Sequence, residues 1–137
     1  MVVTMLEMRL VTEFDRNAPG WSAWRDGAIR GPRDDFSFLR HGEEVCRARI
    51  YPEYPLHARY NGLPPGLVVN LDLIVVRDQL RGQGIGLEAV RLLMRQYLGQ
   101  QMIAFASAEG FWAKTDWVKV PRSEDDVRAW PLYAWGL

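Results

Sequence analysis

Hydrophobic and polar positions along the chain predict a central strand followed by a helix. The range 67–76, LVVNLDLIVV, is a dense apolar run of the kind that forms a buried strand. A polar turn follows it. From 84 to 98 the apolar residues Val90, Leu93 and Tyr97 recur at helical spacing, with Ala89 and Leu92 beside them. We therefore predict a strand over 67–76 and a helix over 84–98.

Shorter patterns predict the other elements. Residues 2–14 mix β-branched and apolar residues with charges and predict a first strand. Breakers leave room for one helix over 21–29, and 109–115 predicts a second brief helix. The sequence HGEE at 41–44 predicts a hairpin turn, and the proline-rich range 52–66 predicts a long loop. The remaining predicted strands are 36–40, 45–51, 102–106, 117–120 and 130–135. This order, with one crossover between 76 and 102, predicts a mixed α/β domain.

Length and charge limit the possible partners. A chain of 137 residues predicts a single domain over 1–137. Seventeen basic and seventeen acidic side chains cancel, so we expect neither nucleic acid nor membrane as a partner. Cys46 is the only cysteine, which excludes an internal disulfide and fits a reducing compartment. The N-terminus lacks a basic leader, and no apolar run reaches about 20 residues. We therefore expect a cytoplasmic protein.

A glycine-rich turn between the central strand and the helix carries the main chemical signal. Three glycines within five positions leave backbone N–H groups bare of side chains. A helix start adds unpaired donors and the positive end of the helix dipole. Together they predict a site for a phosphorylated ligand. The residues of this turn are Arg81, Gly82, Gln83, Gly84, Ile85 and Gly86.

A dinucleotide-binding turn is the first alternative, because residues 84–89, GIGLEA, match its fingerprint with a terminal alanine. Polar residues 77–81 separate the strand from these glycines, whereas a Rossmann turn follows its strand at once. No acidic residue lies near 104 to bind a ribose, and the preceding strands resemble hairpins. A nucleotide-binding oxidoreductase is therefore disfavoured.

The turn resembles the acetyl-CoA-binding motif of the GNAT superfamily of N-acetyltransferases. The downstream sequence FWAKTDW at 111–117 is similar to a second signature of that family, and the likeness covers about 67–120. The resemblance implies an α/β (α+β) fold. Its sheet would be mixed and mostly antiparallel, with a V-shaped splay between the central strands and a few flanking helices. It also implies acetyl-CoA as co-substrate, without a metal.

By this resemblance, backbone N–H groups of the turn bind the pyrophosphate of coenzyme A. The matching residues are Arg81, Gly82, Gln83, Gly84, Ile85, Gly86 and Leu87. A side chain at Gly84 or Gly86 would block the ligand's approach. Backbone groups of the central strand would pair with the pantetheine arm and polarise the thioester. The matching residues are Ile74, Val75 and Val76, with Trp112 beside the cofactor.

Two positions depart from the family pattern. Asn70 stands where members commonly place a glutamate as general base, and an amide can hold a water but takes no proton at pH 7. Asp72 lies two residues on, on the same side of a regular strand, and is our candidate replacement. Trp112 stands where many members carry a tyrosine that protonates the leaving thiolate. Tyr97, Tyr54, Tyr60 or water would then substitute.

The sequence thus predicts direct transfer of an acetyl group from acetyl-CoA to a primary amine. Residues 15–35 and 52–66 would frame the acceptor, a small-molecule or peptide amine. Polyamines, aminoglycosides, amino acids and protein N-termini all remain possible. The first segment is short for the family, which predicts an open site or one completed by a homodimer. The alternative is an acyl-CoA-binding sensor or interaction module with little or no turnover, as Asn70 and Trp112 suggest.

Overall fold

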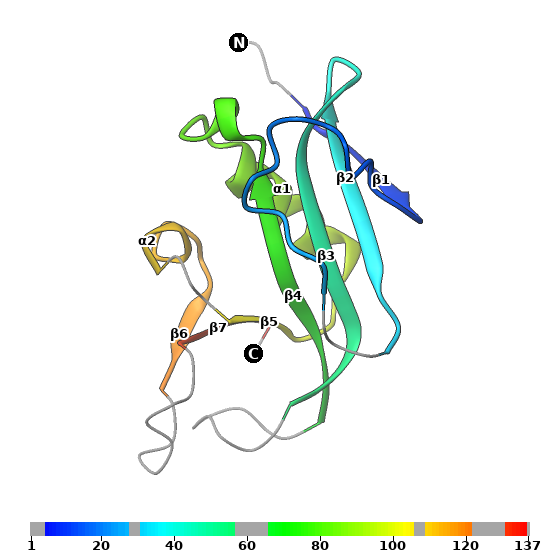
Figure 1. The fold of residues 1–137 in the computed structure, drawn as a ribbon. Helices are drawn as coiled ribbons and strands as arrows, with labels where there is room; N and C mark the ends of the chain where they lie inside the picture. The colour runs from blue at the N-terminus through cyan, green and yellow to red at the C-terminus, as the bar shows by residue number, and fades with distance from the viewer. Residues whose placement is uncertain (1–4, 28–30, 57–65, 106–108, 122–130, 137) are drawn as a thin grey trace.

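A computed structural model describes residues 5–27, 31–56, 66–105, 109–121 and 131–136. The described strands form one seven-stranded sheet in the order β1-β2-β3-β4-β5-β7-β6 (Figure 1). The strands are β1 (Glu7–Val11), β2 (Asp34–Arg40), β3 (Glu43–Leu56), β4 (Gly66–Val76), β5 (Met102–Phe105), β6 (Val118–Val120) and β7 (Leu132–Trp135). The helices are η1 (Asp78–Leu80), α1 (Ile85–Gln96) and α2 (Glu109–Trp112).

The sheet is mixed and mostly antiparallel, as the sequence predicted. Within the described part of the chain, β4 and β5 form the one parallel pair, and every other pair of neighbouring strands is antiparallel. A parallel pair needs a crossover connection, which η1 and α1 provide. The predicted fold class, with few helices, is therefore confirmed.

The central strands β4 and β5 diverge soon after they meet. They pair only through Val69 with Met102 and Asn70 with Ile103, whereas β4 continues to Val76. Beyond Asn70, this edge of β4 has no strand partner among the described residues. Figure 1 shows β5 leaving β4 at a wide angle. The V-shaped splay that the resemblance implied is therefore present.

A β-bulge interrupts β4 beside this divergence. Arg49 of β3 pairs with Leu73, but the next residue, Ile50, pairs with Leu71. Asp72 is therefore the extra residue on β4, and a bulge of this kind re-aims the side chains around it. The bulge thus sets the direction of a predicted site residue.

Helix α1 covers one face of the sheet and completes the core. Its apolar side packs against side chains of β2, β3 and β4, as the helical spacing of Val90 and Leu93 predicted. The opposite face, where β3 presents Arg47 and Arg49, lies beneath the N-terminal segment 12–27. That segment passes in front of β3 and β4 in Figure 1. At β3, therefore, the face of the sheet toward α1 is apolar and the opposite face is charged.

The predicted helix over 21–29 is wrong for its described part, 21–27. A turn at Ser22 and Ala23 stands there instead. The carbonyl of Gly20 accepts a hydrogen bond from the Asp78 N–H at 2.8 Å, and Ser22 donates its N–H and hydroxyl to the Asp78 carboxylate. These long-range bonds satisfy polar groups that a helix would have used internally. Residues 28–29 lie outside the described residues.

Strand ends also differ from the sequence prediction. The hairpin turn contains only His41 and Gly42, at φ 53° and 80°, and both glutamates that follow belong to β3. A two-residue turn with two positive φ angles matches the twist of the flanking strands. Strand β3 runs through Pro52 and Pro55, so part of the predicted 52–66 loop is strand, with a register shift between Tyr51 and Tyr54. Residues 57–65 lie outside the described residues.

Within the described part of the predicted first strand, 5–14, only Glu7–Val11 is strand, and residues 2–4 lie outside the described residues. Helix α2 ends at Trp112 rather than at 115. No helix in the described ranges is both long enough and apolar enough to cross a membrane.

Candidate active site

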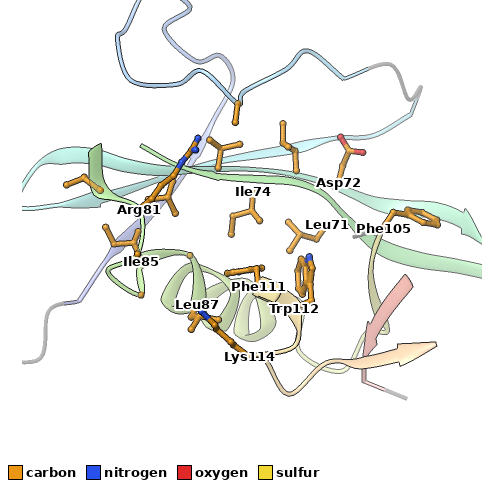
Figure 2. Close-up of a pocket in the computed structure, with 18 residues that line it drawn as sticks. Leu71, Asp72, Ile74, Arg81, Ile85, Leu87, Phe105, Phe111, Trp112 and Lys114 are labelled. Carbon is orange, nitrogen blue, oxygen red and sulfur yellow. The ribbon is translucent and has the colours of Figure 1, made fainter. Parts of the chain in front are cut away.

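A cleft of about 550 Å³ opens where β4 and β5 separate. Residues 71–76 of β4 form one wall, the glycine-rich turn and the first turn of α1 form one end, and Phe111 and Trp112 of α2 form the opposite wall (Figure 2). Most of its lining is apolar, with Asp72, Arg81 and Lys114 as the charged exceptions. The cleft suits a long, largely apolar chain that ends in a charged group.

Two glycines of the turn adopt backbone conformations that other residues rarely take. Gly82 has φ 81° and Gly84 has φ 80°, both in the left-handed region. Gly84 is the N-cap of α1, and no side chain in the described residues caps this helix. A Cβ on either glycine would meet no atom within 4 Å, so the backbone here is open. An uncapped helix start of this kind favours an anion.

Gly86 has a packing role beside the cofactor contact that the resemblance implied. A Cβ there would lie 3.1 Å from Cε2 of Phe111 and 3.5 Å from Cγ2 of Val76. The glycine therefore allows Phe111 to pack closely against the start of α1. It shapes the cleft wall through packing, whereas Gly82 and Gly84 leave space.

Two basic residues, Arg81 and Lys114, line the cleft near the glycine-rich turn. Arg81 Nη2 donates to Asp78 Oδ1 at 2.9 Å, and about half of the arginine side chain is exposed. Lys114 extends from the segment after α2 toward Leu87 in Figure 2. The sequence prediction missed Lys114 as a site residue, although FWAKTDW contains it.

Trp112 is a packed wall of the cleft. Its ring lies 4.8 Å from that of Trp117 and is stacked on Tyr133 at 6.1 Å. In Figure 2 the indole nitrogen points toward Leu71 of β4, which also lines the cleft. Trp112 therefore presents a hydrogen-bond donor to the cleft, although indole is not a workable acid.

Two of the tyrosines proposed as substitute acids, Tyr97 and Tyr54, do not line this cleft. Tyr97 donates its hydroxyl to Asp34 Oδ2 at 2.6 Å, and burial, with the Asp34 carboxylate as a second cause, raises its pKa. Tyr54 packs edge-to-face on Phe105 at 6.1 Å and is not part of the cleft lining. Tyr60 lies outside the described residues. Among these candidates, none of the described hydroxyls is placed to protonate a leaving group.

The two candidate catalytic residues have different surroundings. Asp72 lines the cleft, and its Oδ2 lies 3.4 Å from Arg49 Nη1. Asn70 is fully buried and does not line the cleft, and its two amide atoms have no hydrogen-bond partner within the described structure. Because Asn70 pairs with Tyr51 and Asp72 contacts Arg49, both lie on the face opposite α1. The structure brings Asp72, but not Asn70, to the cleft.

Comparison with known proteins supports the fold. No protein-family model matches the sequence, and no curated protein matches it. An acetyltransferase from Thermus thermophilus superposes with a TM-score of 0.56 and 19% identity over 77% of this chain, and the match spans 64% of that enzyme. A KacTA–DNA complex gives 0.65 and 13% identity, covering 96% of this chain and 92% of that one. A bacterial toxin gives 0.57 and 15%, covering 96% and 90%. The chain has a GNAT-like fold.

The GNAT-like fold collects most of the predicted residues in one place. The cleft lining includes Asp72, Ile74, Val75, Val76, Arg81, Gly82, Gly84, Ile85, Gly86, Leu87 and Trp112. Asn70 and Gln83 are not part of it. Sequence reasoning missed the apolar members, which are Ala23, Leu71, Leu73, Leu80, Phe105 and Phe111. An apolar residue carries no chemical signal of its own, so only the packing of distant segments identifies these.

Proposed function

We propose that this protein transfers an acetyl group from acetyl-CoA to a primary amine. The observation that carries the proposal is the divergence of β4 from β5 beside an uncapped, glycine-rich helix start. An open strand edge offers backbone groups to a pantetheine arm, and the helix start offers N–H groups to a diphosphate. Both features border the same cleft.

The residues present fit coenzyme A as a ligand. Backbone N–H groups of 82–87 would bind the diphosphate, and Arg81 and Lys114 would add charge-assisted hydrogen bonds. The edge at Ile74–Val76 would align the pantetheine arm, and the apolar wall around Leu71 and Phe111 would cover it. Gly82 and Gly84 support this use, because both have positive φ and no atom lies within 4 Å of where a Cβ would be.

In the proposed reaction the neutral amine attacks the carbonyl carbon of the thioester. A C–N bond forms, the C–S bond breaks, and sulfur leaves as the coenzyme A thiolate. The nitrogen loses one proton, so a nearby base or water must accept it. Asp72 is the carboxylate in the cleft, and Arg49 engages one of its oxygens. We propose that its other oxygen binds the amine and accepts that proton, and that solvent protonates the thiolate.

The competing function is acyl-CoA binding without turnover. Asn70 in place of a base and Trp112 in place of an acid favour it, since neither side chain transfers a proton at pH 7. Thiol release from acetyl-CoA, measured across a panel of amines beside calorimetry with coenzyme A, separates the two. Tight binding without release for any amine would favour the binding module. Calorimetry without heat would reject both.

Asp72→Ala and Asn70→Ala together test which side chain is the general base. Asp72→Ala should lower kcat by about 10²–10⁴-fold, the usual contribution of a general base. Asn70→Ala should retain turnover, because Asn70 does not line the cleft. Asp116→Ala, which removes an exposed carboxylate, is the control. Unchanged turnover in Asp72→Ala would reject this assignment.

A further inference from the structure

Strand β1 is one edge of the seven-stranded sheet and carries exposed apolar side chains. It pairs with β2 on one side, and no strand in the described part of the chain pairs with it on the other. Figure 1 shows it at the outer border of the sheet. Leu10 is 66% exposed, and Met5, just before the strand, is 77% exposed. An open strand edge of this kind can accept a further strand.

One face of β1 belongs to the core. Leu6 and Met8 pack into the hydrophobic cluster that includes α1, and Leu10 continues this face because side chains alternate along a strand. The residue opposite Leu10 on β2 is the buried Phe36. Leu10 therefore borders the core but remains uncovered at the open edge.

The other face of β1 carries one acid and one base. Glu7 and Arg9 lie on either side of Met8, and Arg9 Nε donates to Glu7 Oε1 at 2.9 Å. Both side chains are more than half exposed, so they are free to meet charges on a neighbouring strand. Their order along the strand decides which neighbour they would accept.

These two faces match a second copy of β1 in one antiparallel register. With a two-fold axis at Met8, each Glu7 lies opposite Arg9 of the other copy, and opposed residues point to the same face of the sheet. Acid then meets base on one face, and apolar meets apolar on the other. The opposed pairs are Met5–Val11, Leu6–Leu10, Glu7–Arg9 and Met8–Met8.

Other pairings lack this match. An axis at Glu7 would oppose two glutamates, and an axis at Arg9 would oppose two arginines. A shift by one residue would turn the apolar face of one copy toward the charged face of the other. The opposite edge of the sheet, β6, has three residues with Lys119 in the middle, so an axis there would oppose two lysines.

Charged side chains on an edge strand can also serve to prevent association. The exposed Leu10 does not fit that role, because an edge that only avoids partners gains from a polar residue at this position. Glu7 and Arg9, with opposite signs two residues apart, repel a copy in the neighbouring symmetric registers and attract it in the register centred on Met8. The charges therefore select a register.

We propose that two copies of this chain associate through β1 in this register and form one continuous sheet. The two-fold axis is perpendicular to the sheet, so α1 of both copies lies on the same face. Strands β2 and β3 separate β1 from β4, so the second copy leaves the first cleft open. This dimer differs from one that would complete the cleft, and it does not depend on acetyl transfer.

Sedimentation velocity of the full chain, from about 1 µM to about 500 µM, tests for the dimer. We expect a Kd of about 1–100 µM, because one short strand buries less surface than a standard interface and such contacts are weak. A chain that stays monomeric up to about 500 µM would overturn the proposal.

Charge reversal tests the register. Glu7→Arg or Arg9→Glu alone places like charges opposite each other twice in the symmetric dimer, so each should raise Kd about tenfold or more. An equimolar mixture of the two variants should form a heterodimer with a Kd near that of the wild type, because opposite charges meet again. The double variant Glu7→Arg/Arg9→Glu should restore the homodimer for the same reason. Asp116→Arg reverses an exposed charge elsewhere and should leave Kd unchanged.

The mixture and the double variant also distinguish a lost interface from a lost fold, since a variant that does not fold cannot be rescued by its counterpart. Single reversals without effect, or a loss that neither the mixture nor the double variant restores, would overturn the assigned register.

Leu10→Ser and Leu98→Ser separate this edge from another exposed apolar position. Leu98 is 82% exposed just beyond α1, away from β1 in the sequence and in its element. Leu10→Ser should raise Kd about tenfold or more, because two leucine contacts are lost in each dimer, and Leu98→Ser should leave Kd unchanged. The opposite result would place the interface at the end of α1 and overturn the proposal.

Discussion

The backbone conformation of Gly84 matters both for the stability of the protein and for the candidate site. Its φ of 80° places it in the left-handed region at the N-cap of α1, beside the cleft. Residues with a Cβ reach that region at a cost of about 1–2 kcal/mol. Gly99 has nearly the same φ, 84°, but lies in the turn between α1 and β5, outside the cleft lining. The two glycines form a natural pair for comparison.

We expect Gly84→Ala to destabilise the protein by about 1 kcal/mol and to weaken coenzyme A binding, because the peptide groups of the turn must shift. Gly99→Ala should have a similar stability cost without a change in affinity. Urea denaturation and calorimetry measure the two effects. If both variants weakened binding equally, the loss would come from stability and not from the turn.

Asp35 makes stability depend on pH. Burial raises its pKa above the ordinary 3.8, Arg33 and Arg49 oppose this effect, and Asp34 adds to it. Between 3.8 and the raised value, the folded state holds more protons than the unfolded state. The free energy of unfolding contributed by Asp35 therefore falls as pH rises through that window.

Asp35→Asn removes this titration. The free energy of unfolding of the wild type, minus that of Asp35→Asn, should therefore fall as the pH is raised above 3.8. Urea unfolding of both proteins over a pH series measures it, with Asp116→Asn as an exposed control. A difference that stays flat, or that rises with pH, would contradict the assignment.

One apolar stripe packs helix α1 against the sheet. Ala89, Val90 and Leu93 are buried against the sheet, whereas Leu98, just beyond the helix, is 82% exposed. The helix start borders the cleft, so packing of the stripe also positions the glycine-rich turn. Burial of this stripe therefore supports both the core and the candidate site.

Leu93→Ala should destabilise the protein by about 2–5 kcal/mol, because it removes buried methyl groups and leaves a cavity. Leu98→Ala makes the same chemical change at an exposed position and should stay within about 0.5 kcal/mol. Urea denaturation measures both free energies. A similar cost for the two would mean that α1 does not pack as described.

The pairing of β4 with its neighbours gives this strand an open edge and a bulge. Pairing with β3 continues along its length, pairing with β5 ends at Asn70, and the bulge at Asp72 follows directly. One strand therefore supplies both an open edge and a carboxylate to the same cleft.

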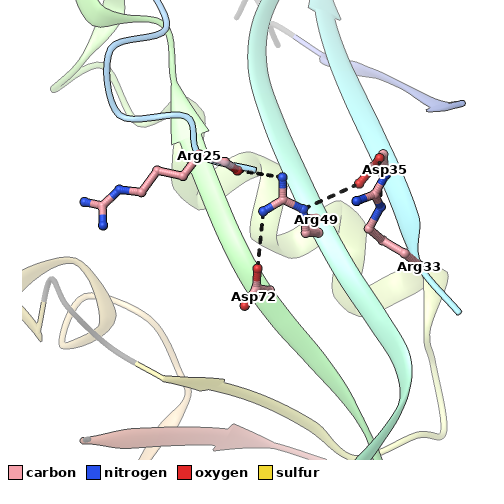
Figure 3. Close-up of polar contacts among 5 residues, drawn as sticks. All are labelled: Arg25, Arg33, Asp35, Arg49 and Asp72. Atoms are coloured by element: carbon pink, nitrogen blue, oxygen red, sulfur yellow. Dashed lines mark hydrogen bonds and ion pairs between the residues drawn. The ribbon is translucent and has the colours of Figure 1, made fainter. Parts of the chain in front are cut away.

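In the whole molecule, Asp72 lines the first cleft and contacts Arg49 (Figure 3), which lines a second cavity of about 510 Å³ beneath segment 12–27. Closure of segment 12–27 over the sheet depends on Asp78, which binds Gly20 and Ser22 and also accepts from Arg81. The turn that begins the candidate site is thus tied to the segment that covers the second cavity. Binding in the first cleft should stabilise the molecule as a unit.

Acetyl-CoA should raise the thermal midpoint if it binds the folded state alone. At a concentration of about 100 Kd the gain is about 2.7 kcal/mol, which corresponds to a shift of several degrees for a domain of this size. NAD and NADP at the same concentration should leave the midpoint unchanged. A shift with NAD or NADP but not with acetyl-CoA would favour the oxidoreductase alternative.

The sequence by itself determined the features that depend on local pattern. Helical spacing located α1, the apolar run located β4, and the glycine-rich turn between them pointed to one phosphate-binding region. Each of these signals lies within a few residues, where side-chain periodicity and backbone freedom act directly. The family resemblance then implied the splayed sheet before any strand pairing was known.

Tertiary structure alone decided what depends on distant segments. The bulge that aims Asp72, the ion pairs of Arg49 and the bonds that keep 21–27 from forming a helix all join residues far apart in sequence. The sequence offered both Asn70 and Asp72 as site residues, but pairing of β4 with β3 and β5 buried one and opened the other. Register and burial arise from the whole sheet, so no local pattern contains them.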